Sequence, residues 1–174
     1  MSKSLIAYFS RKGNNYAGDA IVNLQVGNTE VVANKIQHLT KGDLFHLETV
    51  TPYPEDYTAC TEVAQKELRE RVRPELTAMV QNMDFYDVIY LGYPNWWGTM
   101  PMAVCNFLES YDFSDKVIIP FCTHEGSGMG HSERDIKKLC LNASVLSGLA
   151  IRGSNVNEAD LEIASWLKKS VVTL

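Results

Sequence analysis

Short apolar runs alternate with amphipathic segments along the whole chain, and this alternation predicts strands and helices in turn. Strands that are apolar on both faces are typical of a parallel sheet covered by helices on each side. The pattern therefore predicts an α/β fold with a five-stranded parallel sheet. The five runs expected to form its strands are residues 5–9, 44–47, 87–93, 116–122 and 145–151.

Helices are predicted between these runs, where apolar residues recur at helical spacing. One helix opens at residues 27–30, one begins near Tyr57 and ends before Pro74, and one begins near Pro101. Ser132, with Asp135 three residues later, resembles a capping box and is expected to open a helix that ends at Leu139. The last helix is expected to have Asn157 at its start, because Glu158 and Asp160 then complement its dipole.

The stretch after the first strand contains a turn of small polar residues in two pieces. Ser10, Arg11 and Lys12 follow the strand directly, whereas Asn28 and Thr29 stand at the start of the first helix. Helix N-termini with free N–H groups and neighbouring hydroxyls are suited to bind a phosphate. We therefore expect the two pieces to form one phosphate site, with residues 14–26 as an excursion that includes a short extended segment at 21–24.

The loop after the third strand, residues 93–101, contains the adjacent tryptophans Trp96 and Trp97. A tryptophan left in water forgoes a large apolar burial, so these rings are expected to pack against something. One alternative is that both pack on neighbouring helices. The other is that at least one, with Trp97 the stronger candidate, covers a flat conjugated ligand whose edge the backbone approaches at Pro94, Asn95 and Gly98.

The loop after the fourth strand, residues 123–131, is rich in glycine and offers backbone amides to a ligand. Gly126 and Gly128 follow Thr123, His124 and Glu125. His124 and Glu125 have no distant partner at metal-ligand spacing, so no metal site is expected. The two residues are either solvent-exposed loop residues or part of the site.

The three stretches together indicate a ligand. Because a phosphate site, an aromatic cover and bare amides suit a phosphate joined to a planar heterocycle, flavin mononucleotide (FMN) is the candidate ligand.

The composition narrows the class of protein. The 174 residues are 45% hydrophobic and are expected to form one domain, 1–174. The net charge is −5 and the sequence contains no basic stripe, which argues against a nucleic-acid partner. Four cysteines without a CxxC pair predict buried, reduced thiols. Without a signal-peptide core or an apolar run of membrane-spanning length, the chain is expected to be cytoplasmic.

The sequence resembles the flavodoxin-like FMN proteins, in particular a bacterial subgroup with a Gly-Tyr-Pro-x-Trp-Trp-Gly-Thr loop, here residues 92–99. The resemblance covers essentially the whole chain and includes the glycine-rich loop 126–130. It implies a three-layer sandwich with strand order 2-1-3-4-5 and FMN at the point where the strand order reverses. The phosphate would lie on Ser10, Arg11 or Lys12, Asn28 and Thr29, and the ring among residues 94–98 and 123–126.

The resemblance implies two redox functions, and a third reading departs from both. The first is an FMN oxidoreductase that takes electrons from NAD(P)H and reduces a quinone-like or other small acceptor, with His124 as candidate proton donor and Glu125 beside it. The second is an electron carrier that moves single electrons between redox protein partners. The third is an interaction domain that keeps the fold without the flavin. A homodimer is compatible with each of them.

Overall fold

The computed structural model describes residues 3–173, with side chains of the last helix described to residue 171. Apolar residues of the predicted runs form a parallel sheet in the order β4-β1-β5-β6-β7, and β8 also pairs with β6. Apart from the fifth strand, each predicted strand matches an observed one to within two residues at either end. The strands of this sheet are β1 (Ser4–Tyr8), β4 (Asp43–His46), β5 (Val88–Pro94), β6 (Val117–His124), β7 (Ser144–Val145) and β8 (Leu149–Arg152).

The prediction of one fifth strand at 145–151 is wrong, because that edge consists of β7 and β8 in succession. β7 pairs with the start of β6 and β8 with its end. The break lies beside Pro120, which has no N–H to donate to a neighbouring strand. Gly148 passes so close to β6 that a Cβ there would lie 2.9 Å from the Pro120 carbonyl oxygen. With the two short strands counted as one, the strand order is the expected 2-1-3-4-5.

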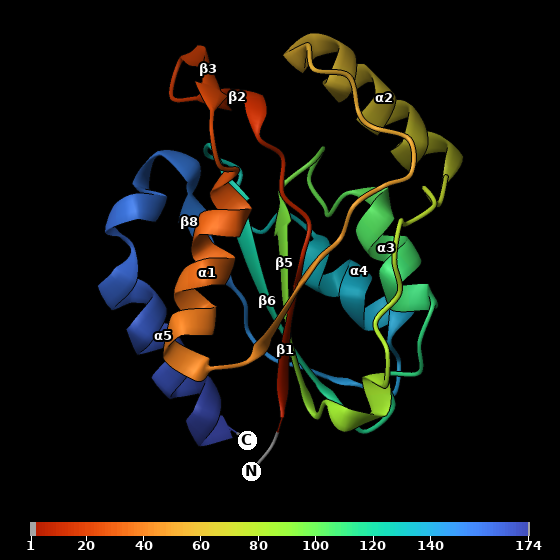
Figure 1. The fold of residues 1–174 in the computed structure, drawn as a ribbon, viewed down its shortest axis with the longest axis vertical. Helices are drawn as coiled ribbons and strands as arrows, with labels where there is room; N and C mark the ends of the chain where they lie inside the picture. Colours follow the sequence, from red (N-terminus) through yellow and green to blue (C-terminus); the bar gives the residue numbers. More distant parts are fainter. Residues whose placement is uncertain (1–2, 174) are drawn as a thin grey trace.

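Four helices cover the two faces of the sheet, because alternate residues of each strand point to opposite sides. α1 (Asn28–Thr40) and α5 (Asp160–Thr173) lie on one face and bury Ile6 and Tyr8. α3 (Met102–Glu109) and α4 (Ser132–Leu139) lie on the other and bury Leu5 and Ala7. α2 (Tyr57–Glu70) projects beyond the carboxyl ends of the strands, above α3 (Figure 1).

Two helix starts differ from the prediction. Ser132 does not form a capping box, since His131 is the N-cap residue and makes no side-chain cap bond. The Ser132 hydroxyl donates instead to the Met129 carbonyl at 2.6 Å, and Asp135 accepts from Thr99 and His131. The last α-helix begins at Asp160 rather than Asn157, because a 3-10 helix, η2 (Gly153–Glu158), precedes it. A second 3-10 helix, η1 (Met83–Phe85), precedes β5.

The predicted excursion is an antiparallel hairpin of β2 (Gly13–Ala17) and β3 (Ala20–Leu24). It forms a two-stranded sheet of its own and does not join the parallel sheet. The expected extended segment at 21–24 lies within β3. In Figure 1 the hairpin stands beside α2 at the carboxyl end of the sheet, so the two together frame that end.

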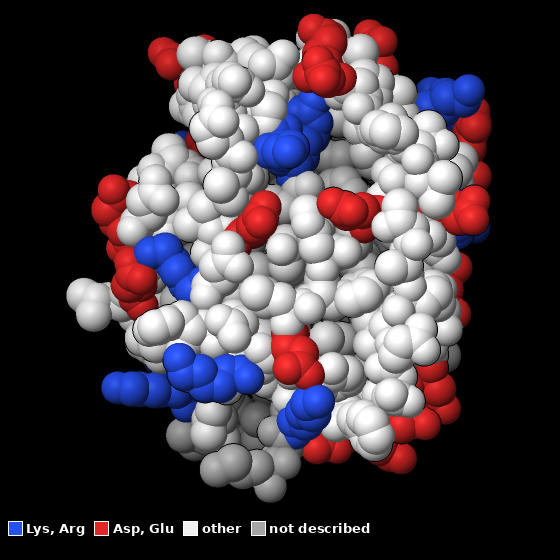
Figure 2. Space-filling model, in the orientation of Figure 1, with Lys and Arg blue, Asp and Glu red and all other residues white. Residues whose placement is uncertain are grey.

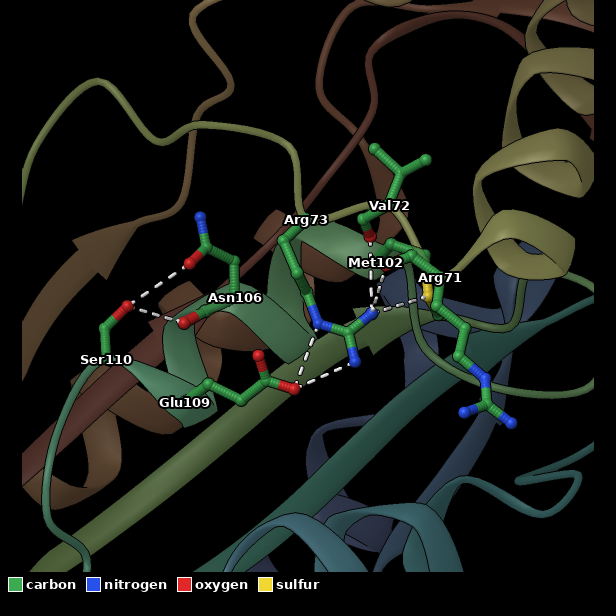
Figure 3. A network of polar contacts seen from close by, with 7 residues as sticks. All are labelled: Arg71, Val72, Arg73, Met102, Asn106, Glu109 and Ser110. Atoms are coloured by element: carbon green, nitrogen blue, oxygen red, sulfur yellow. Dashed lines mark hydrogen bonds and ion pairs between the residues drawn. The ribbon is translucent and has the colours of Figure 1, made fainter.

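The segment that follows α2 is fastened to α3 by Arg73 (Figure 3). The guanidinium donates to Glu109 Oε1 from Nε at 3.0 Å and from Nη2 at 2.8 Å. It also contacts Met102 Sδ at 3.6 Å. Arg73 therefore fixes the position of the end of α2 relative to α3.

Two further findings concern the predicted class. All four cysteines are buried, as expected, and each is a free thiol. Within residues 3–173, no helix combines the length and apolar character needed to cross a bilayer.

Candidate functional site at the carboxyl end of the sheet

The two pieces of the split turn lie against each other, as the sequence predicted. A Cβ on Gly27 would lie 2.2 Å from Ser10 Oγ and 2.8 Å from the Arg11 carbonyl oxygen, so only glycine allows this approach. Ser10 Oγ accepts a hydrogen bond from the Glu30 amide at 3.1 Å. The amides of Asn28 and Thr29 belong to the same first turn of α1, where no helix carbonyl reaches them. Both residues line the cavity described next.

The first cavity has a volume of about 300 Å³. It lies between the start of α1, the ends of β5 and β6, and the hairpin. It brings together most of the residues that the sequence assigned to the phosphate and the ring, although they come from four separate stretches. Its lining residues are Arg11, Asn15, Tyr16, Asn28, Thr29, Tyr57, Pro94, Asn95, Trp96, Thr123, His124, Glu125 and Ser127.

Thr29 joins α1 to the end of β6 within this cavity. Its side chain is 1% exposed, and its Oγ1 lies 2.8 Å from Thr123 Oγ1 in a hydroxyl–hydroxyl hydrogen bond. Thr123 is 4% exposed, so both hydroxyls of the pair are buried. Leaving either buried hydroxyl without a partner would cost about 1–3 kcal/mol, and the hydrogen bond therefore holds the two side chains in a defined geometry.

Some of the predicted site residues lie elsewhere. Ser10 and Lys12 line a separate, wider groove of about 770 Å³, which Arg11 also borders. On the face that Figure 2 shows, acidic and basic side chains both occur, and the acidic ones gather toward the lower right edge. Gly98, Gly126 and Gly128 are in the loops around the first cavity but do not line it.

Arg11 is engaged by the backbone rather than free to meet an anion. Its Nη2 donates to the carbonyl oxygens of Pro54 and Glu55, each at 2.8 Å, and its Nη1 donates to that of Asn14. The side chain thus ties the base of the hairpin to the segment that leads into α2. Of the two basic candidates for the phosphate, Arg11 lines the first cavity and Lys12 does not.

Residues 96–99 form a two-residue hairpin turn. Trp96 N donates to Thr99 O at 2.8 Å, and Thr99 N donates back to Trp96 O at 3.3 Å. Trp97 and Gly98 occupy its centre with φ values of 57° and 86°, the left-handed pair that a type I′ turn requires. Left-handed φ is uncommon for a tryptophan, so this backbone places the indole ring where an extended chain would not.

Asn95 anchors this turn to its neighbours. Its amide donates to Thr123 O at 2.8 Å, its Nδ2 donates to Gly128 O at 2.8 Å, and its Oδ1 accepts from Gly98 N at 2.9 Å. On the far side of the turn, the His131 amide donates to Gly98 O at 2.8 Å. The loops after β5 and β6 are therefore one connected unit.

The two tryptophans have different surroundings. Trp96 packs edge-on against Phe9 and Tyr53, with ring centroids 5.2 and 5.0 Å away, and it still lines the first cavity. Trp97 is 49% exposed and donates from Nε1 to Thr61 O of α2 at 2.9 Å. Trp97 lines a second, neighbouring cavity and does not line the first, so Trp96 is the tryptophan that borders the first cavity.

His124 has one of its ring nitrogens assigned by the structure. Nδ1 accepts a hydrogen bond from the Gly126 amide at 2.9 Å, so a neutral His124 carries its proton on Nε2. Burial lowers the pKa of His124, and the nearby Arg152 lowers it further, while Glu125 acts in the opposite direction. The neutral imidazole is therefore favoured in this environment.

Glu125 acts as a clasp between distant segments. Its Oε2 accepts from the Gly18 amide at the tip of the hairpin at 3.2 Å, and its Oε1 accepts from the Ser154 amide of η2 at 3.0 Å. Arg152 Nη1 lies 4.0 Å from Oε2. The side chain is 13% exposed, which argues against the alternative of a solvent-exposed loop residue.

Tyr16 of the hairpin and Tyr57 of α2 line the cavity although no sequence signal marked them. Their rings stack with centroids 6.1 Å apart and an interplanar angle of 30°. In the sequence, Tyr57 marks the expected start of a helix and Tyr16 is an isolated aromatic residue in a polar stretch. Only the topology brings the two rings together. In the described part of the chain, no three His, Cys, Asp or Glu side chains are grouped closely enough to bind a metal ion.

A family model described as Flavodoxin matches residues 3–170. The chain belongs to the flavodoxin family. Comparison with curated protein sequences finds no match.

Solved structures share the fold. A protein assigned as a flavoprotein from Bacteroides eggerthii is 26% identical, with a TM-score of 0.72 over 94% of this chain and 99% of that one. One from Bacteroides uniformis is 24% identical, with a TM-score of 0.76 over 96% and 98%. A flavoprotein from Lactobacillus acidophilus NCFM, in complex with FMN, is 19% identical, with a TM-score of 0.67 over 91% and 98%.

The first cavity fits the cofactor of this family. The N-terminus of α1 at Asn28 and Thr29 suits a phosphate. The lining also contains the aromatic ring of Trp96 and the imidazole of His124. Family membership and this donor set support FMN as the cofactor, as the sequence indicated.

Proposed function

We propose that this flavodoxin-family protein is an FMN-dependent oxidoreductase that passes electrons from NAD(P)H to a small quinone-like acceptor. The observation that carries the proposal is the environment of His124 in the first cavity. A neutral imidazole with its proton on Nε2, in the lining of the first cavity, can exchange a proton as electrons move. Proton exchange of this kind serves two-electron chemistry on small molecules.

The residues around His124 have separate roles in this proposal. Asn28 and Thr29 bind the phosphate through their amides, and Arg11 orients the hairpin base over it. Asn95 fixes the loops on both sides of the ring, and Trp96 gives the ring an apolar wall. When bound, FMN would accept a hydride and release electrons singly or in pairs. His124 and Glu125 thus keep different roles, a proton-exchanging group and a clasp.

An electron carrier between proteins is the second candidate function, favoured by the family itself. Steering toward a charged protein partner requires clustered charge. On the face that Figure 2 shows, acidic and basic side chains are mixed, and this face therefore offers no single-sign surface for such steering.

The test is to load the purified protein with FMN and to measure reduction of a small naphthoquinone by NADH and by NADPH. The expected rate is at least tenfold above that of the same concentration of free FMN. A rate equal to that of free FMN, together with full reduction by a reduced one-electron protein donor, would favour the carrier instead.

A further inference from the structure

A second cavity, of about 410 Å³, lies next to the first and shares a wall with it. Tyr57, Asn95 and Trp96 border both cavities, together with Arg11 and Asn15 at the base of the hairpin. The residues that belong to the second cavity alone come from α2 and from the turn after β5. These are Cys60, Thr61, Ala64 and Trp97.

The chemistry of the second cavity differs from that of the first. Among the described residues, none that lines it is acidic and none is a histidine, whereas the first cavity has both Glu125 and His124. Its walls are three aromatic rings, those of Tyr57, Trp96 and Trp97, with small residues of α2 between them. Flat aromatic walls suit a planar ligand, and the polar side chains that complete the lining are not acidic: Arg11, Asn15, Thr61 and Asn95.

One group in this cavity can recognise a carbonyl oxygen. A guanidinium has five N–H donors, and three hydrogen bonds of Arg11 go to backbone carbonyls. Burial raises the pKa of the Cys60 thiol and is the larger effect. The nearby guanidinium of Arg11 acts in the opposite direction and lowers this pKa. Three of the five N–H donors thus go to backbone carbonyls and one to the Cys60 thiol, which leaves one that could donate to a ligand.

The walls of the cavity are fixed from several sides. The Trp97 indole N–H donates to Thr61 O, which joins the turn to α2, and Arg73 fastens the segment after α2 to α3. Trp96 is packed between Phe9 and Tyr53. A preformed cavity of this kind binds a rigid ligand without a large ordering cost.

We propose that the second cavity binds the oxidising substrate, a planar uncharged aromatic dicarbonyl of the quinone class, and that Ala64 sets its size limit. This inference rests on the proposed function. The quinone gains two electrons and two protons, so both C=O groups become C–OH. NAD(P)H supplies a hydride, which provides both electrons and one proton, and the other proton comes from solvent.

Ala64 is the position for the test because it is 7% exposed, lines the second cavity and does not line the first. Ala64→Leu fills part of the cavity from the wall of α2. The matched control is Gln65→Leu, which adds the same residue at the next, exposed position of the helix. Ala64→Val adds less volume and covers the case in which the leucine disturbs folding.

Two measurements read the outcome. In the FMN-loaded protein, Ala64→Leu is expected to raise KM for a naphthoquinone at least tenfold with kcat within twofold, and Ala64→Val to give a smaller rise. Ferricyanide is an anion that is not expected to bind in the aromatic second cavity, so its reduction is expected to stay unchanged. In equilibrium dialysis without NAD(P)H, the oxidised FMN-loaded protein is expected to bind the naphthoquinone, with at least tenfold weaker binding in Ala64→Leu and unchanged binding in Gln65→Leu.

Three results would overturn the inference: unchanged quinone binding in Ala64→Leu, no binding of naphthoquinone by the wild type in dialysis, or a tenfold loss of FMN affinity in Ala64→Leu. The last would mean that the second cavity holds part of the flavin. Absence of NAD(P)H-dependent turnover in the wild type would overturn the proposed function alone, because dialysis still measures the quinone site.

Discussion

The turn at residues 96–99 and the β2–β3 hairpin border the same cavity but are held in place differently. Asn95 anchors the turn through its side chain and backbone, and the His131 amide binds its far side. The hairpin is paired mainly with itself. Its tip is joined to the body through Glu125, its side through the Tyr16–Tyr57 stack and its base through Arg11. We infer that the turn is part of the scaffold and that the hairpin is a cover that can loosen separately.

The largest effect is expected from Asn95→Ala, which removes two side-chain hydrogen bonds that join the loops after β5 and β6. Loss of these partly buried bonds should reduce the free energy of unfolding by about 2–3 kcal/mol, because the Gly98 amide and the Gly128 carbonyl lose their partners. Urea denaturation of the FMN-free protein measures it. Asn34→Ala, at an exposed position of α1, is the control and should change stability by less than about 0.5 kcal/mol. Equal values for the two variants would mean that the turn does not belong to the scaffold.

Thr29→Ala and Asn15→Ala compare the body with the hairpin at the cofactor itself. Thr29→Ala leaves Thr123 Oγ1 without its buried partner and is expected to weaken FMN binding about tenfold. Asn15 donates only to Arg11 O and Gly13 O within the hairpin base, so its removal should cost less than about threefold. Titration with FMN measures both, and Thr29→Ser should restore binding. Equal losses would place the hairpin in the phosphate site.

Glu125→Gln weakens the clasp at the tip of the hairpin without changing the length of the side chain. A neutral acceptor gives weaker hydrogen bonds than a carboxylate, and the new amide group faces an amide donor, so about 1 kcal/mol is expected to be lost. FMN should dissociate about fivefold faster while the free energy of unfolding of the FMN-free protein changes little. Stopped-flow dissociation measures the rate. Glu162→Gln, at an exposed position of α5, is the control. A stability loss in Glu125→Gln as large as that of Asn95→Ala would contradict the inference that the hairpin is a cover.

The smallest effect is expected from pH, through His124 at the root of the loop that carries the clasp. Burial and Arg152 lower its pKa in the folded protein, so the unfolded chain binds this proton more readily. The contribution is present above the unfolded pKa of about 6.5 and is lost as the pH falls below it toward the folded pKa. His124→Asn should flatten the decline in stability between about pH 6.5 and 5, as followed by urea midpoints. An unchanged slope would show that other groups cause the decline.

The sequence predicted the strands of the parallel sheet well, because nearly continuous apolar runs have few alternatives in a domain of this size. It missed the division of the last strand, since the break depends on Pro120 and Gly148 meeting across the sheet. The capping box at Ser132 failed because a hydroxyl within reach of a carbonyl, here that of Met129, can donate instead of capping.

The candidate site was predictable where its parts follow strand ends. Thr29, Asn95 and His124 are near the ends of elements that a parallel sheet brings to one edge. Tyr16, Tyr57 and the clasp formed by Glu125 were not predictable, because each depends on a pairing between segments far apart in the chain. Local periodicity contains no information on which hairpin tip meets which carboxylate.

The pairing of β8 with the last four residues of β6 has a consequence for the order in which the protein becomes competent. Thr123 and His124 have Ile151 and Arg152 as strand neighbours, and Glu125 takes the Ser154 amide. Ser10, by contrast, is synthesised well before these residues. Synthesis must therefore pass residue 154 before the loop after β6 has its native supports, and contacts with such large sequence separation form late in folding. A growing chain should therefore capture the cofactor only after residue 154 has been made.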